Sequence, residues 1–149
     1  MPTFDLGSPG SLDAIADELA KLAGRPGTII ITYDGKKASI DYVERDLASV
    51  IEEATSGEYI VSSARAFTDY EKHGSNYHVR IMINAGALKD AVEFAWGLFN
   101  ILIGLDRLDA TDVVKLFAVV FDKYLGVGRM WLELHEAFEY AWFKMIWGP

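Results

Sequence analysis

Hydrophobic residues recur at helical spacing in two segments of the first half of the chain. In GSLDAIADELAKLAGRPG, four of them share one face of a predicted helix: Leu12, Ile15, Leu19 and Leu22. Ser11 is placed to cap this helix, and Gly24 followed by Pro26 predicts its end. A shorter helix is predicted in RDLASVIEEATSG, with Asp46 as its cap and Gly57 at its end.

Between and after these helices the pattern changes to the period-two alternation that is typical of strands. The segment GTIIITYDGKKASIDYV combines a β-branched run with an Asp34-Gly35 turn, which predicts a β-hairpin. Two further strands are predicted in EYIVSSARAF and NYHVRIMIN, joined by the polar loop TDYEKHGS. The order αββαββ predicts an α+β fold with a four-stranded, mainly antiparallel sheet and two helices on one face. The segment PTFDL could add a short edge strand.

The second half of the chain is more apolar, and its spacing predicts three helices, at residues 87–105, 109–126 and 131–147. The first of them is apolar almost all round, so we expect it to be buried on most of its sides. The length of the chain suits a single domain over residues 1–149. Within it, we expect the α/β part (1–85) and the helical part (86–149) not to fold independently.

The last predicted helix is rich in aromatic residues. Trp131 lies on its apolar stripe, and packing against the preceding helices is sufficient to explain that stripe. Tyr140, Phe143 and Trp147 lie off the stripe, among acidic residues. Large apolar groups on a polar side are typical of a surface that binds a partner. The predicted interaction surface therefore consists of Trp131, Tyr140, Phe143 and Trp147.

The helical half also supplies more apolar surface than a sheet face requires. One or two helices would cover the remaining face, yet the chain supplies three. Either these helices form a small core of their own or part of their surface is buried between subunits, and we favour a homodimer. A membrane is disfavoured, because a spanning helix needs about 20 apolar residues. Attachment of the last helix to a membrane surface is disfavoured as well, since its polar face carries three glutamates against one lysine.

Charge and composition narrow the possible functions. The 149 residues include 22 acidic and 14 basic ones, and no cluster of Lys and Arg emerges, so nucleic-acid binding lacks its electrostatic basis. The net charge of −8 could suit a basic protein partner. The chain has no cysteine, which removes disulfides and thiolate chemistry. Its first residues, MPTFDLGSPG, lack the features of a secretory signal, and we expect a cytoplasmic location.

A candidate metal site lies in LHEAFE, where His135 and Glu139 are neighbours on the last helix. This segment lacks the second histidine of a zinc-binding HExxH motif. It also has no second Glu-x-x-His pair for a di-iron site. We therefore predict no metal and no cofactor, and we interpret His135 as hydrogen-bonded to its neighbouring carboxylate.

A second candidate site lies in RAFTDYEKHGSNYHVR. It gathers basic and polar residues that would suit a small anionic ligand, namely Arg65, His73, Tyr77, His78 and Arg80. Alternation along the last strand puts His78 and Arg80 on the same face, and Arg65 could join them if the register allows. A solvated hairpin explains the same pattern without any ligand.

No set of residues has the spacing of a catalytic site, which favours a non-enzymatic function. We expect an interaction or structural module that self-associates through its apolar C-terminal helices. The alternative is a domain that binds or converts a small anionic ligand at the polar sheet face around Arg65, His78 and Arg80.

Overall fold

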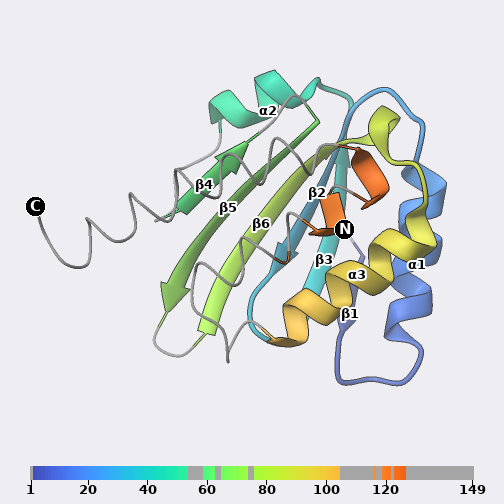
Figure 1. The fold of residues 1–149 in the computed structure, drawn as a ribbon, viewed down its shortest axis with the longest axis vertical. Coiled ribbons are helices and arrows are strands. Elements are labelled where there is room, and N and C mark those ends of the chain that lie inside the picture. The colour runs from blue at the N-terminus through green and yellow to red at the C-terminus, as the bar shows by residue number, and fades with distance from the viewer. Residues whose placement is uncertain are drawn as a thin grey trace, which may run out of the picture.

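The computed structural model describes residues 2–53, 59–62, 65–73, 76–104, 116, 119–121 and 123–126. The elements in chain order are β1 (Thr3–Asp5), α1 (Ser11–Leu22), β2 (Thr28–Tyr33), β3 (Lys37–Val43), α2 (Leu47–Glu53), β4 (Tyr59–Ser62), β5 (Ala66–His73), β6 (Asn76–Asn84), the 3-10 helix η1 (Ala85–Ala87) and α3 (Ala91–Gly104) (Figure 1). Residues 119–121 and 123–125 are also helical, and we call them the 119–125 segment.

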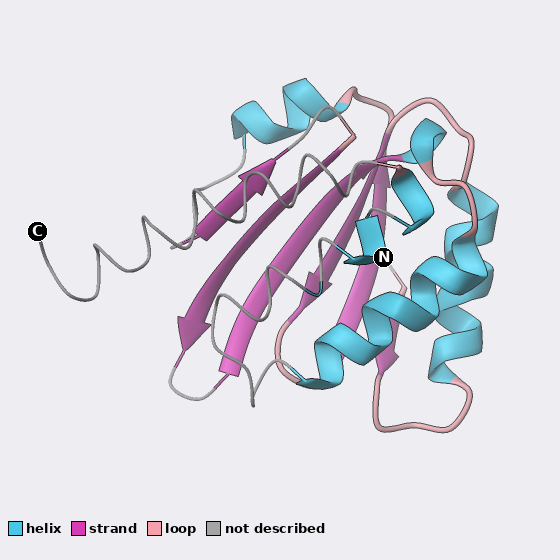
Figure 2. Ribbon diagram, viewed as in Figure 1, coloured by secondary structure: helices cyan, strands magenta, loops and turns pink. Residues whose placement is uncertain are grey.

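The six strands form one sheet in the order β1-β3-β2-β6-β5-β4, and all neighbours are antiparallel (Figure 2). The α+β class is confirmed, whereas the predicted number of four strands is wrong. PTFDL supplies the edge strand β1, and EYIVSSARAF is divided between β4 and β5. β5 also continues through TDYEKH. The prediction of a loop there, which rested on the polar composition of this segment, is wrong. Pairing with β6 along its whole length satisfies this backbone, and polar side chains do not prevent a strand from forming.

The helices cover both faces of the sheet, so the prediction of two helices on one face is wrong. Alternate residues of β6 point to opposite faces. Ile81 belongs to the cluster that includes α1 and α3, whereas Met82 packs in a separate cluster with Leu47 and Val50 of α2. Met82 is an apolar residue on the otherwise polar side of β6, and α2 lies where it can cover that side chain.

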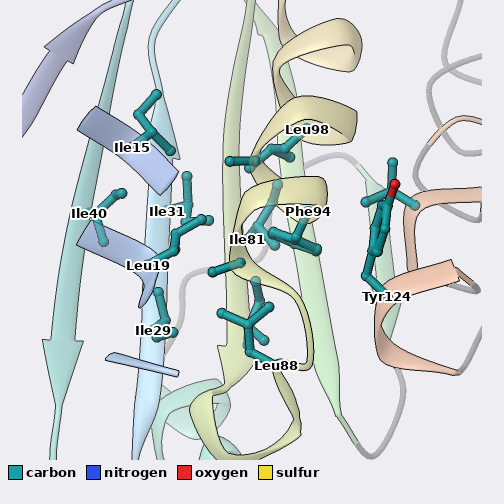
Figure 3. Packing of buried hydrophobic residues seen from close by; sticks show 14 of the residues in the cluster. Ile15, Leu19, Ile29, Ile31, Ile40, Ile81, Leu88, Phe94, Leu98 and Tyr124 are labelled. Atoms are coloured by element: carbon teal, nitrogen blue, oxygen red, sulfur yellow. The ribbon is translucent and has the colours of Figure 1, made fainter. Parts of the chain in front are cut away.

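The main hydrophobic core lies between the sheet and the layer formed by α1, α3 and the 119–125 segment (Figure 3). Isoleucines from three strands line its sheet side: Ile29, Ile31, Ile40, Ile81 and Ile83. The ring of Phe94 in α3 contacts Phe121 and Tyr124 edge-on, with centroid distances of 5.8 and 6.4 Å. Residues of the α/β part and of the helical part thus contribute to one core.

The local signals of the N-terminal half are largely confirmed. The Asp46 carboxylate accepts a hydrogen bond from Ser49 N at 2.8 Å and caps α2 as predicted. The Asp34-Gly35 turn is present, with Gly35 at a φ of 104°. The cap of α1 is different, because Gly10 occupies that position and no side chain caps the helix. Ser11 is instead the first helical residue.

The helical half is described in part. α3 confirms the first predicted helix, and the 119–125 segment ends at Gly126, whose φ of 69° suits a glycine after a helix. The predicted third helix, at 131–147, lies outside the described residues. None of the helices within the described residues combines the length and the apolarity that crossing a bilayer requires.

Candidate functional site

One side of α3 is buried and the opposite side exposes large apolar residues. The buried side packs on the sheet, α1 and the 119–125 segment through Ala91, Phe94, Ala95, Leu98, Ile101 and Leu102. On the other side Val92, Trp96 and Ile103 are 53, 51 and 52% exposed. Successive members are four and seven positions apart, which places them on one helix face. We call these three residues the outer stripe.

The prediction that this helix is buried on most of its sides is therefore only partly correct. The all-round apolar character of residues 87–105 was the available signal, but it does not distinguish burial in the chain's own core from an apolar surface left open. Within the outer stripe, Trp96 contacts the partly buried Phe99 edge-on, with ring centroids 6.5 Å apart. This contact restricts the orientation of the indole ring on the surface.

The helical residues that pack beside α3 expose apolar side chains as well. Val120 lies against Gly97 of α3, where a Cβ would be only 2.9 Å from a methyl group of Val120. Leu116, which is also helical, and Val119 of the 119–125 segment are 37 and 62% exposed. The exposed large hydrophobic residues of the described structure thus belong to α3 and its helical neighbour. Concentrated apolar surface of this kind is typical of a protein interaction site.

Charged groups lie at only one end of α3. Asp90 caps the helix, since its carboxylate accepts a hydrogen bond from Glu93 N at 3.0 Å. Lys89 precedes it, and Glu93 is exposed in the first turn. From residue 94 to residue 104 the helix carries no charge, and Asn100 is its one strongly polar side chain. Along most of its length, α3 itself therefore contributes no charge beside the outer stripe.

The residues predicted to form the interaction surface, Trp131, Tyr140, Phe143 and Trp147, lie outside the described residues. The described helices that precede them do expose an apolar surface, the outer stripe, at positions that the sequence analysis expected to be buried.

The residues proposed for an anionic ligand are not brought together as a set. Arg80 of β6 lies opposite Thr32 of β2, and its side chain is half-buried. His78, two residues earlier in β6, is exposed. Arg65 lies near the other end of β6, where its carbonyl accepts a hydrogen bond from Asn84 N. Its guanidinium contacts the carbonyl oxygens of Leu125 and Gly126, with Nη1 2.5 Å from the former.

Because Leu125 belongs to the core on the α3 side, Arg65 reaches toward that side, away from His78 and Arg80. The other two residues of the predicted site, His73 and Tyr77, occupy paired strands, where His73 pairs with Asn76 and Tyr77 with Lys72. Their side chains lie outside the described part of the structure. Sequence reasoning could not place these residues relative to one another, since the strand register was unknown.

Two open grooves are lined by other residues. The first has a volume of about 580 Å³ and lies between the loop before β2 and the connection from β3 to α2. The second has a volume of about 370 Å³ and is lined by residues of three segments: Asp5, Leu6, Gly7, Tyr33, Gly35, Lys36 and Ile103. Ile103 therefore connects the outer stripe with the second groove. The described residues include no group of three or more His, Asp or Glu side chains that could hold a metal ion.

Comparison with models of protein families, with curated proteins and with solved structures found no match to this chain. Its function must therefore be inferred from its own residues.

Proposed function

We propose that this protein is a non-enzymatic interaction module that self-associates through its apolar C-terminal helices. The observation that carries the proposal is the outer stripe, whose three large side chains are each 51–53% exposed on one face of α3. An exposed Trp flanked by aliphatic residues is a favourable composition, because Trp is among the residues most enriched where binding energy is concentrated.

The outer stripe contributes a limited amount of binding energy. Fully burying a large apolar side chain contributes roughly 1.5–3 kcal/mol, so a half-exposed one has about 1 kcal/mol left to gain. The three stripe residues together with Leu116 and Val119 would then contribute about 5 kcal/mol. Association costs roughly 4–15 kcal/mol in lost freedom. Further apolar surface is thus required, and the predicted residues Trp131, Tyr140, Phe143 and Trp147 would supply it.

A second copy of the chain is a suitable partner because an apolar surface can pack against the same apolar surface of another copy. In a two-fold symmetric dimer the same surface of each subunit meets itself. If two α3 helices pack antiparallel, Asp90 and Glu93 of one copy lie far from the same acids of the other. That arrangement also places each helix N-terminus near the C-terminus of its partner, which the helix dipoles favour.

The proposal is tested by light scattering on the full chain after size-exclusion chromatography at tens of micromolar. We expect a dimer for the original sequence and a shift toward the monomer for Trp96→Gln and for the double variant Val92→Ser/Ile103→Ser. Ala20→Ser, at an exposed position of α1, is the control and should remain dimeric. Thermal unfolding of each variant separates loss of association from loss of the fold. If the original sequence is a monomer at this concentration, the proposal is wrong.

The alternative function, a site for a small anionic ligand around Arg65, His78 and Arg80, is less well supported. It required the two arginines to converge, and Arg65 instead contacts the end of the 119–125 segment. Arg80 and His78 remain on one face, but Arg65 does not join them there. We therefore retain self-association as the proposed function.

A further inference from the structure

The first groove lies at the end of the sheet, where β2 begins and β3 ends. Arg25, Pro26 and Gly27 form one wall, and Tyr42, Glu44 and Arg45 belong to the other side. Its volume of about 580 Å³ falls in the range of sites that bind small molecules, which is roughly 300–1,000 Å³. No residue of this groove belongs to the outer stripe, so the groove is distinct from that surface.

The backbone around the groove is held by hydrogen bonds to buried residues of the sheet and its neighbours. The hydroxyl of Thr28, which is fully buried, donates to the carbonyl oxygen of Arg45 at 2.9 Å. The carbonyl oxygen of Gly27 accepts a hydrogen bond from Ala85 N at 3.0 Å. Both sides of the groove are therefore tied to the sheet and to the segment after β6. A site whose walls are fixed before binding loses little conformational freedom when a ligand enters.

Gly27 allows the two walls to approach each other. Its φ is 135°, and a Cβ at this position would lie 2.6 Å from the carbonyl oxygen of Val43 and 2.7 Å from the hydroxyl oxygen of Tyr42. Only glycine fits this space without strain. The Tyr42 hydroxyl donates a hydrogen bond to the carbonyl oxygen of Pro26. This hydrogen bond fixes the orientation of the tyrosine ring that lines the groove.

Three of the charged groups near the groove are already engaged. Arg45 forms an ion pair with Glu53, which raises the pKa of the arginine and lowers that of the glutamate through their hydrogen bond. The Asp46 carboxylate accepts hydrogen bonds from Ser49, and these lower its pKa. These groups therefore keep their charges, but their hydrogen-bonding capacity is largely directed toward each other and toward α2.

Two charged side chains of the lining are not engaged in this way. Arg25 and Glu44 are exposed, and within the described structure neither has an ion pair or a side-chain hydrogen bond. They line the same groove without pairing with each other, so it presents one positive and one negative group at separate positions. A simple anion would approach Glu44 and Asp46, and a simple cation would approach Arg25 and Arg45, so neither matches the lining.

We propose that this groove binds a zwitterionic small molecule of the α-amino-acid type. The ligand carboxylate would pair with the Arg25 guanidinium, whose planar fork suits a carboxylate. The ligand ammonium would pair with the Glu44 carboxylate. The apolar part of the ligand would lie against the ring of Tyr42 and against Pro26. Such a ligand satisfies both unengaged charges at once and leaves the net charge of the groove unchanged.

The test is an NMR titration of the full chain with glycine, L-leucine and L-phenylalanine, observing backbone amides. We expect saturable shifts at Gly27, Glu44 and Arg45 for at least one of the three amino acids. Acetate and isopentylamine each carry only one of the two charges. Each should bind about tenfold or more weakly than the best amino acid, because a charged hydrogen bond contributes roughly 1.5–3 kcal/mol. Absence of saturable shifts with all three amino acids would overturn the proposal.

Variants identify the residues responsible. Arg25→Gln and Glu44→Gln should each weaken amino-acid binding about tenfold or more, and Arg25→Gln should also abolish the response to acetate. Lys37→Gln and Asp17→Asn remove the same charges at exposed positions outside the groove and serve as matched controls. Because Arg25 and Glu44 are exposed and make no ion pair within the described structure, both variants should fold normally. If Arg25→Gln binds the amino acid as well as the original sequence does, the assignment is wrong.

Discussion

Gly97 lets α3 and the 119–125 segment approach each other, and replacing it with alanine tests that contact. An alanine Cβ at this position would lie 2.9 Å from a methyl carbon of Val120 and 3.4 Å from a ring carbon of Tyr124. Carbon atoms in favourable contact are about 3.5–4.0 Å apart. Because Val120 is buried, it has little room to move away from the new methyl group.

Two effects of Gly97→Ala oppose each other. Alanine is more favourable than glycine in a helix interior by about 1 kcal/mol. Overpacking of a buried contact costs roughly 1–3 kcal/mol. We therefore expect a net loss of about 1 kcal/mol in the free energy of unfolding. In a Val120→Ala background the clash is removed, and the same substitution should instead stabilise the protein by about 1 kcal/mol. The coupling between the two positions should thus be about 2 kcal/mol.

Urea unfolding followed by tryptophan fluorescence measures all four members of this cycle. Asn100→Ala, at an exposed position of α3, controls for helix propensity and should be neutral or slightly stabilising. A stabilised Gly97→Ala variant with no coupling to Val120→Ala would refute the reasoning. In that case the 119–125 segment would not pack on this side of α3, and the location of the outer stripe would have to be reconsidered.

Three further predictions concern the sheet and its connections. The Thr68 hydroxyl is buried and has no hydrogen-bond partner in the described structure, so Thr68→Val should raise the free energy of unfolding by about 1 kcal/mol, measured in urea. Gly27→Ala should destabilise the protein by roughly 1–3 kcal/mol from the backbone conformation alone, with the contact to Val43 adding to the loss, as a thermal scan would show. The carboxyl pKa of Asp46, measured by NMR titration, should lie below its usual value and rise in Ser49→Ala, because hydrogen bonds from Ser49 stabilise the charged form. This stabilisation is present above the usual aspartate pKa and is lost as the pH falls through the lowered one, so α2 should fray in acid.

Local features of the fold were predictable from the sequence, because their causes lie within a few residues. The Asp34-Gly35 turn requires a positive φ that glycine adopts readily, and Asp46 caps the helix that follows it directly. The side of the sheet on which α2 lies was not predictable in this way. It depends on the contact between α2 and Met82, which is far from α2 in the sequence. The sheet face on which Met82 lies is known only once the strands are paired.

The candidate sites show the same division. The distance between Arg65 and Arg80 depends on strand register. Arg65 lies beside Asn84 of β6, which is four residues further along that strand than Arg80. For α3, composition indicated an unusual helix but not which side remained exposed. That side is determined by where α1, the sheet and Val120 pack, which involves residues distant in the sequence. The sequence also did not predict that Arg25 and Glu44 line one groove, because they belong to separate connections between elements.

The central claim is that outer stripes of two copies face each other, and a distance between labelled subunits tests it most directly. Because the chain contains no cysteine, Asn100→Cys provides a unique site for a nitroxide label beside the stripe. Pulsed electron paramagnetic resonance should detect a short intermolecular distance with a narrow distribution, since the axes of packed helices lie about 8–10 Å apart. Ala20→Cys, on α1, should give a longer distance, and Trp96→Gln should remove the signal from position 100. Absence of intermolecular coupling at position 100, or a signal unchanged by Trp96→Gln, would contradict the account.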